Sequence, residues 1–211
     1  MTGRTVAVLL AAGAGTRLGR GPKALLAHGG RPLVEHVAGV LCDGGCDEVV
    51  VVLGAEASRV AVAADLGAAR VVVNDDWATG MASSLRTGVA AALEPRGGET
   101  PARVVVAHVD QPGVTPDDVA RLLAAHRPGR VTASRWAGAA APDHAAPEQR
   151  RPRWAHPLVL DAALAETAAA SAVGDAGARA FLRAHADLID VVVHPGDGRD
   201  VDTEADLDLL A

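Results

Sequence analysis

Short runs of β-branched residues alternate with alanine-rich helical patterns, and this alternation constrains the fold more than any other feature. The runs that predict strands are residues 5–10, 48–53, 70–73, 103–108, 130–133, 157–160 and 188–194. Helical patterns lie between or after them, at about 32–41, 57–66, 83–93, 116–126, 161–170, 176–186 and 203–210. Most of the strand runs are continuously apolar, which is typical of strands buried on both faces of a parallel sheet. The sequence therefore predicts a doubly wound, three-layer α/β fold with a mostly parallel sheet.

Composition and charge limit the partners that this chain can bind. The net charge is −6, so no overall field attracts nucleic acid or an anionic membrane, and an anionic ligand must meet local positive charge. No apolar run approaches the roughly eighteen residues of a membrane span, and Arg4 interrupts the start of the chain, so we expect a cytoplasmic protein without a signal peptide. Two cysteines, Cys42 and Cys46, are too few for a disulfide framework or a structural zinc site, which favours reduced thiols.

A glycine-rich loop follows the first predicted strand, and residues 10–23 read LAAGAGTRLGRGPK. Gly13, Gly15 and Gly19 are spaced one residue too far apart for a dinucleotide fingerprint, and the ATPase phosphate-binding motif is not matched. Arg17 and Lys23 add two fixed positive charges, which suit a triphosphate better than a pyrophosphate shielded by a helix end. A glycine-rich turn with a solvated arginine and lysine stays open as the structural alternative.

A second polar loop, NDDWATGMASSLRTG at 74–88, follows the third predicted strand. Ser83 and Ser84 precede a helical pattern, so we expect one of them to cap that helix. Together with Gly80, a helix N-terminus here would form a second backbone-rich pocket. An ordinary capped helix is the alternative.

Two carboxylates are placed to reach the same edge of the sheet. Asp110 follows a buried strand in VVVAHVDQP, and Asp202 lies between the last strand and a helical pattern in DVDTEAD. If they converge, they can hold Mg²⁺, which takes one or two carboxylates plus substrate phosphates. Helix capping is the alternative for Asp202, and a turn residue the alternative for Asp110. His108 is near Asp110, but no histidine pair has metal-ligand spacing, and we expect most of the eight histidines at the surface.

Six motifs occur in an order that resembles the nucleotidyltransferases related to molybdenum cofactor cytidylyltransferase. They are LAAGAGTRLGRGPK, GMASSLRTG, DQP, HPLVL, GDAGAR and DVDTEADL, and the resemblance runs from about residue 5 to 210. It implies a Rossmann-like nucleotidyltransferase fold over a single domain, 1–211. It also implies a Mg²⁺-dependent enzyme that transfers a nucleoside monophosphate to the terminal phosphate of molybdopterin and releases pyrophosphate. Relatives that transfer guanylate usually have glycine in place of Ala12, so CTP is favoured as the donor.

The same resemblance assigns a role to individual residues. Arg17, Lys23 and Asp110 would be catalytic; Ala11, Ala12, Gly13 and Gly15 would hold the nucleotide and its triphosphate; Gly80, Ser83 and Ser84 would line the nucleoside pocket; Asp110 and Asp202 would bind Mg²⁺; and His156, Asp175 and Arg179 would lie on the acceptor side. The implied partners are a nucleoside triphosphate, a phosphorylated small molecule, and a molybdoenzyme or its maturation factor.

The acceptor side departs from the family pattern. Ala155 stands where a glycine usually precedes the His-Pro pair, Trp154 comes before it, and residues 135–153 read as a flexible insertion without periodicity. A sugar phosphate or another phosphorylated acceptor is therefore one alternative, and a non-catalytic carrier of a pterin cofactor is a second. A nicotinamide-dependent dehydrogenase is a third, disfavoured by the glycine spacing and by the absence of an acidic residue about twenty positions beyond the loop.

Overall fold

A seven-stranded sheet, in the order β5-β4-β1-β6-β8-β7-β9, organises the computed structural model, which describes residues 3–138, 154–196 and 198–211. Among the strands of that sheet, β8 alone runs antiparallel to its neighbours, β6 and β7. The strands are β1 (Thr5–Leu10), β4 (Glu48–Leu53), β5 (Arg70–Val73), β6 (Arg103–His108), β7 (Val131–Trp136), β8 (Ala155–Asp161) and β9 (Ile189–His194). The predicted three-layer α/β fold with a mostly parallel sheet is confirmed.

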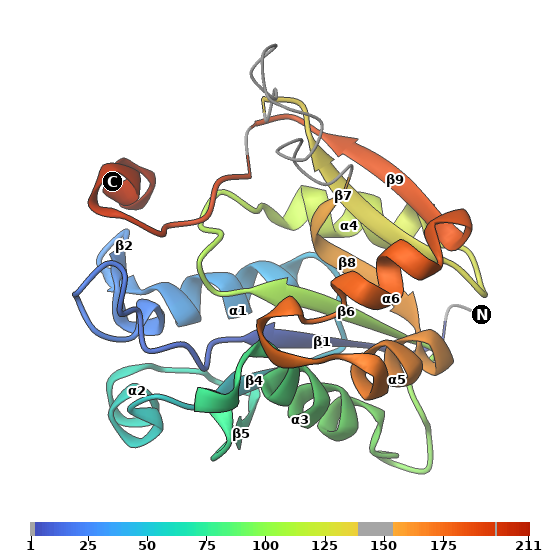
Figure 1. Ribbon diagram of the computed structural model, residues 1–211, viewed down its shortest axis with the longest axis horizontal. Helices are drawn as coiled ribbons and strands as arrows, with labels where there is room; N and C mark the ends of the chain where they lie inside the picture. Colours follow the sequence, from blue (N-terminus) through green and yellow to red (C-terminus); the bar gives the residue numbers. More distant parts are fainter. Residues whose placement is uncertain (1–2, 139–153, 197) are drawn as a thin grey trace.

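Helices cover both faces of this sheet and divide the core in two (Figure 1). Successive strand residues alternate between the two clusters: Ala7 and Leu9 belong to one, Val6 and Val8 to the other. On the Leu9 side lie α1 (Leu33–Asp43), α2 (Ala57–Ala63) and α4 (Pro116–Ala125); on the Val8 side lie α3 (Met81–Leu93), α5 (Ala162–Ser171) and α6 (Arg179–Ala184).

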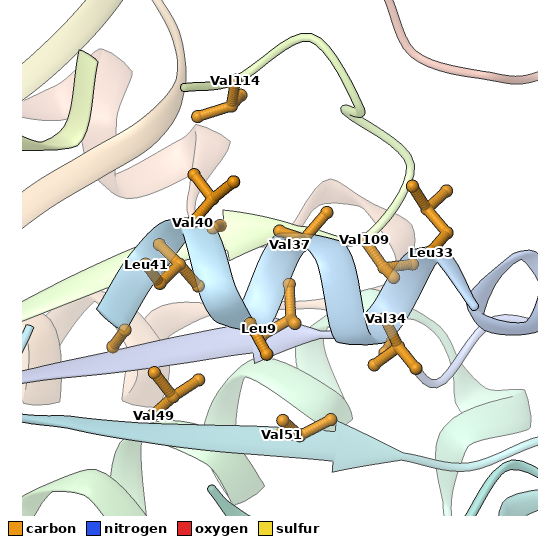
Figure 2. Packing of buried hydrophobic residues seen from close by; sticks show 14 of the residues in the cluster. Leu9, Leu33, Val34, Val37, Val40, Leu41, Val49, Val51, Val109 and Val114 are labelled. Atoms are coloured by element: carbon orange, nitrogen blue, oxygen red, sulfur yellow. The ribbon is translucent and has the colours of Figure 1, made fainter. Parts of the chain in front are cut away.

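Helix α1 shows how aliphatic residues alone fill this core. Its buried residues recur at helical spacing, and Figure 2 shows Val34, Val37 and Leu41 facing the sheet at Leu9 of β1 and at β4. Each such side chain stabilises the fold by about 1.5–3 kcal/mol when it is fully buried. Aromatic residues make up only 2% of the chain, so this close aliphatic packing supplies most of the core.

Three local predictions differ from the structure. Two short strands, β2 (Ala27–His28) and β3 (Arg31–Pro32), form a hairpin that we did not predict, and its turn is Gly29-Gly30 with φ of 57° and 80°. The predicted helix 176–186 is interrupted: the 3₁₀ turn η4 (Gly174–Ala176) is separated from α6 by Gly177, whose φ is 52° and ψ −134°. The predicted helix 203–210 is a 3₁₀ helix, η6 (Glu204–Leu210), which begins with a capping box between Thr203 and Asp206.

The predicted insertion at 135–153 begins too early. Arg135 and Trp136 belong to β7 and pair with Val193 and His194 of β9. That part of the prediction was wrong because the apolar run at 130–133 is extended by an arginine and a tryptophan that do not look like core strand residues. Residues 139–153 lie outside the described part of the chain.

Two further features of the described chain bear on the sequence analysis. Cys42 and Cys46 are both free thiols, and burial raises the pKa of Cys46 to about 12. Within residues 3–138, 154–196 and 198–211, no helix is long and apolar enough to cross a membrane.

Candidate active site

A large cleft lies over the carboxyl ends of the central strands, where open α/β sheets bind their ligands. Leu10 pairs with Val52 of β4 and with His108 of β6, so these three strands end level with one another. The cleft has a volume of about 1450 Å³. Twelve of the predicted site residues line it: Ala12, Gly13, Gly15, Arg17, Lys23, Gly80, Ser84, Asp110, His156, Asp175, Arg179 and Asp202.

Lys23 joins the glycine-rich loop to both predicted metal ligands. Its Nζ lies 2.8 Å from Oδ2 of Asp110 and 2.5 Å from Oδ1 of Asp202, although these residues are far apart in the sequence. The amide of Val201 donates to the carbonyl of Asp110 at 2.8 Å, which fixes the segment after β9 against the end of β6. Burial alone would lower the pKa of Lys23, but the two carboxylates raise it, so the ammonium stays charged. The two carboxylates therefore converge, as the sequence analysis required.

The glycine-rich loop after β1 folds back on itself at Gly15, where only glycine fits. Gly15 has a φ of 64°, and a Cβ at this position would lie 2.0 Å from the carbonyl oxygen of Gly21. Its own carbonyl accepts from the amides of Leu18 and Gly19. Arg17 extends from this turn with its side chain 79% exposed and its guanidinium 3.5 Å from Asp202. The loop thus offers one buried and one exposed cation to the cleft.

Asp110 and Asp202 fit a divalent cation. Oδ1 of Asp110 is buried without a hydrogen-bond partner, and the ammonium of Lys23 lies between the two carboxylates, where a positive charge is stabilised. In the described residues, no group of three or more histidines, cysteines or acidic residues forms a complete metal cage. Two carboxylates with open positions suit Mg²⁺, which keeps waters and binds substrate phosphates.

Asp200 is a third carboxylate at this site, which the sequence analysis missed. It lines the cleft, and burial together with the nearby charges of Asp110 and Asp202 raises its pKa to about 6. Its position two residues before Asp202 in DVDTEAD was the only signal in the sequence.

Hydrogen bonds from Asn74 stabilise the second predicted loop, at 74–88. Its Nδ2 donates to Oγ of Ser83 at 2.8 Å and to Oγ of Ser84 at 3.0 Å, and both serines are buried. The expectation that a serine caps the helix was wrong, because α3 begins at Met81 with Gly80 as its N-cap residue. Ser83 Oγ instead lies within hydrogen-bonding distance of the carbonyls of Asp76 and Gly80, at 3.0 and 2.9 Å.

Two predicted nucleotide-binding residues do not line the cleft. Ser83 is turned into its own loop, and Ala11 is buried in the core, where its amide donates to Val52. Hydrogen bonding within the loop therefore accounts for Ser83, and packing in the core accounts for Ala11.

Gly80 connects the nucleoside loop with the acceptor side. Its φ is 115°, and a Cβ there would lie 2.6 Å from the carbonyl carbon of Gly174 and 2.8 Å from Oδ1 of Asp175. The start of α3 therefore packs directly on η4, which carries Asp175 into the cleft.

A pair of stacked imidazoles forms the floor of the acceptor side. The rings of His108 and His156 lie 3.9 Å apart between centroids, with an interplanar angle of 27°. Burial is the main cause that lowers the pKa of both, and the charge of Arg179 lowers both further, so both rings are neutral at pH 7.

The sequence could not show this pair. His108 meets His156 because Val106 pairs with Leu158 across β6 and β8, and the register of an antiparallel strand pair is not visible in either strand alone. His194 is an exception to the expectation that most histidines lie at the surface, because it is fully buried against Asp118.

Comparisons with known proteins agree with this geometry. The profile of the MobA-like NTP transferase domain matches residues 7–188. Nicotine blue oxidoreductase from Paenarthrobacter nicotinovorans is 48% identical over 198 residues, which are 93% of this chain and 91% of that protein. The crystal structure of Rv0371c from Mycobacterium tuberculosis H37Rv in complex with manganese has a TM-score of 0.76 and 25% identity, covering 98% of each chain.

A more distant structure shares only the fold. CMP:2-keto-3-deoxy-manno-octonic acid synthetase complexed with CTP has a TM-score of 0.69 and 20% identity, covering 97% of this chain and 95% of that one. The family profile spans both the glycine-rich loop and the cleft at the end of β6. With the converging carboxylates, the stacked imidazoles and the near full-length relative, this places the chain in the MobA-like NTP transferase family, as a nucleotidyltransferase.

Proposed function

We propose that this nucleotidyltransferase moves a nucleoside monophosphate, CMP from CTP, to the terminal phosphate of molybdopterin and releases pyrophosphate. The observation that carries the proposal is the cluster of Lys23, Asp110 and Asp202 beside a glycine-closed loop. A protein that only carries a finished cofactor needs neither the cations of the glycine-rich loop, Arg17 and Lys23, nor a pair of converging carboxylates.

In this proposal the protein positions the reactants and neutralises charge. A terminal oxygen of the acceptor phosphate bonds to the α-phosphorus while the bond to the β-phosphate breaks, and pyrophosphate takes the electron pair. Arg17 and Lys23 stabilise the negative charge that gathers on the pyrophosphate. Asp110 and Asp202 would hold the metal ion, which would neutralise charge on the transferring phosphate. No general base is needed because a phosphate monoester is already ionised near pH 7.

Two observations support the finer parts of the proposal. Ala12 lines the cleft at the position where guanylate-transferring relatives usually have glycine, which favours CTP. The manganese complex of a structural relative supports a divalent metal ion, and Mg²⁺ is the ion that suits the two carboxylates best.

The test is an assay of pyrophosphate release with a panel of donors and acceptors. CTP, GTP, ATP and UTP are each offered with molybdopterin and, in parallel, with a set of sugar phosphates, with Mg²⁺ or with EDTA. We expect release with CTP and molybdopterin that EDTA abolishes. Pyrophosphate release with a sugar phosphate, and not with molybdopterin, would show that the acceptor is a sugar phosphate. No release with any pair of donor and acceptor would contradict the proposal.

A second candidate function comes from the name of the most extensive relative. That protein is a nicotine blue oxidoreductase, and 48% identity over 93% of this chain favours a related redox activity. The loop after β1 argues against a dinucleotide site of the usual kind, in which a helix begins directly after the glycines and its N-terminus binds the pyrophosphate. Here the 3₁₀ turn η1 (Lys23–Leu25) and the β2-β3 hairpin follow the loop, and α1 begins only at Leu33.

The two functions are separated by one spectroscopic assay. The chain is mixed with nicotine blue and NADH or NADPH, and the visible absorbance of the dye is followed. The nucleotidyltransferase proposal expects no bleaching above the rate without protein. Bleaching that Asp110→Ala leaves intact would assign this chain the activity named for its relative.

A further inference from the structure

Two residues at the carboxyl end of β6 each have a buried polar atom without a hydrogen-bond partner. These atoms are Nε2 of His108 and Oδ1 of Asp110, and both residues line the cleft. Buried polar groups nearly always have a hydrogen-bond partner, so an unpaired one at a cleft wall points to a ligand. The metal ion of the proposed function accounts for Asp110. It does not account for His108, whose ring nitrogen calls for a ligand that accepts a hydrogen bond.

The surroundings of His108 indicate which ligand this is. His108 ends β6, Asp110 lies in the turn that follows two residues later, and both residues line the cleft. His108 is also close enough to Arg179 for that guanidinium to lower its pKa, and Arg179 lines the same cleft. A nitrogen donor beside a guanidinium and next to a metal-binding carboxylate is a set that recognises a phosphate group.

His156 holds the ring of His108 in place. The two imidazoles stack with centroids 3.9 Å apart, and Nε1 of Trp136 donates to the backbone carbonyl of His156 at 3.3 Å. The stack fixes the plane of the His108 ring, and therefore the direction in which Nε2 points. His156 is thus a positioning residue.

We propose that Nε2–H of His108 donates a hydrogen bond to the terminal phosphate of the acceptor, with Arg179 supplying the opposing charge. The inference rests on the proposed nucleotidyl transfer and adds a substrate-contacting residue that no motif predicted. A neutral imidazole suits the task because it orients the attacking phosphate without removing its nucleophilic charge.

The test measures phosphate binding without turnover. The chain is saturated with Mg²⁺ and α,β-methylene-CTP, which occupies the triphosphate loop and cannot transfer its nucleotide, and inorganic phosphate is titrated by calorimetry. His108→Phe keeps the stacked ring and removes the donor, while His108→Gln restores a donor. The matched control is His28→Phe. The ring of His28 also packs against a histidine, His36, at a tilted angle of 54°, and it has a buried, unpartnered ring nitrogen, but His28 does not line the cleft.

We expect His108→Phe to weaken phosphate binding by tenfold or more, as loss of a hydrogen bond to a charged group does, with the affinity for the CTP analogue unchanged. His108→Gln should recover part of the loss, and His28→Phe should match the wild type. Equal phosphate affinity in His108→Phe and the wild type would overturn the inference, as would an equal loss in His28→Phe.

A second readout uses the wild-type protein and covers the case in which a variant does not fold. In ¹⁵N-histidine-labelled protein, phosphate should shift the Nε2 resonance of His108 and leave that of His28 in place. An unmoved His108 resonance at saturating phosphate would overturn the inference. Failure of the proposed function has a different signature, because the CTP analogue itself would then fail to bind, or pyrophosphate release would be absent while phosphate still shifts His108.

Discussion

The two halves of the cleft use different physical means to bind a substrate. The nucleotide half consists of a glycine-closed loop with two cations, Arg17 and Lys23, paired with carboxylates. The proposed acceptor half is built on strands, with the stacked imidazoles of His108 and His156 and the guanidinium of Arg179. In the proposed function, the first half would bind the triphosphate by charge whatever the acceptor, and the second half would select the acceptor by its shape and by directed hydrogen bonds. Changes in the first half should alter catalysis with every acceptor, whereas changes in the second should alter which acceptor is used.

The largest effect is expected from Asp110→Ala. Removal of this carboxylate leaves Lys23 with one partner and takes away the buried oxygen of the metal site, so we expect pyrophosphate release to fall by at least about 10²–10³-fold. The fold should persist, as followed by circular dichroism. Glu166→Gln on the exposed side of α5 is the control and should retain wild-type turnover. Wild-type turnover by Asp110→Ala would contradict the assignment of Asp110 as a ligand of the metal ion.

Gly80→Ala tests the junction between the two halves. A Cβ would lie 2.6 Å from the carbonyl carbon of Gly174 at a φ of 115°, so both strain and collision oppose it. We expect a loss of about 1–3 kcal/mol in the free energy of unfolding and weaker binding of CTP. Gly97→Ala has a φ of 62° and open space around it, and therefore measures strain alone. An equal loss in both variants, with CTP binding intact, would show that the junction has no part in the site.

A pair of serine variants separates structure from binding within one loop. Ser83→Ala leaves the buried amide of Asn74 with one partner fewer, and should lower the free energy of unfolding by about 1–3 kcal/mol. Ser84→Ala removes a hydroxyl that lines the cleft and should also raise the KM for CTP. Chemical denaturation and steady-state kinetics check the two effects. A raised KM in Ser83→Ala and not in Ser84→Ala would reverse the assignment.

The smallest effect expected is a pH dependence of stability from the acceptor half. Burial holds the pKa of His156 well below 6.5 in the folded protein, so the unfolded chain binds its proton at a higher pH. The stabilisation is therefore complete above about pH 7 and is lost as the pH falls through 6.5, by up to about 1.4 kcal/mol per pH unit for one proton.

His156→Gln should reduce this loss. Urea unfolding at pH 7.5 and pH 5.5 is compared in the variant and in the wild type, and the difference between the two pH values should be smaller in the variant. His36, His108, His126 and His194 also have pKa values lowered by burial and are present in both proteins, so the difference between the proteins reports on the site of His156 and its contact with His108. Identical pH dependence in the two proteins would show that His156 titrates as it does in water.

The architecture and the nucleotide half could be predicted because their signals are local. Most buried strands are continuous apolar runs, and the loops after β1 and β5 carry their own glycines and charges. The hairpin at 27–32 was missed although Gly29-Gly30 is a usual two-residue turn, because its strands are only two residues long. The capping error arose because Ser83 and Ser84 look like cap residues, whereas Asn74, nine and ten positions earlier, binds both hydroxyls.

His156, Asp175 and Arg179 were placed on the acceptor side by resemblance, but the contacts made there could not be predicted because they depend on strand register and packing. His108 and His156 face each other only through the pairing of β6 with β8, and Gly80 meets Asp175 only when η4 is folded against α3. Asp200 belongs to the site through its proximity to Asp110, which is distant in sequence. None of these contacts leaves a periodic or motif signal in the chain.

The central claim is that this cleft binds a nucleoside triphosphate through Asp110 and a divalent metal ion. Thermal-shift measurements with CTP, GTP, ATP, UTP and NADH, each with Mg²⁺ and with EDTA, test it most directly on the wild type and on Asp110→Ala. We predict that CTP raises the melting temperature most, that the increase requires Mg²⁺, and that Asp110→Ala abolishes it. Stabilisation by NADH alone, unaffected by Mg²⁺ and by Asp110→Ala, would contradict the account.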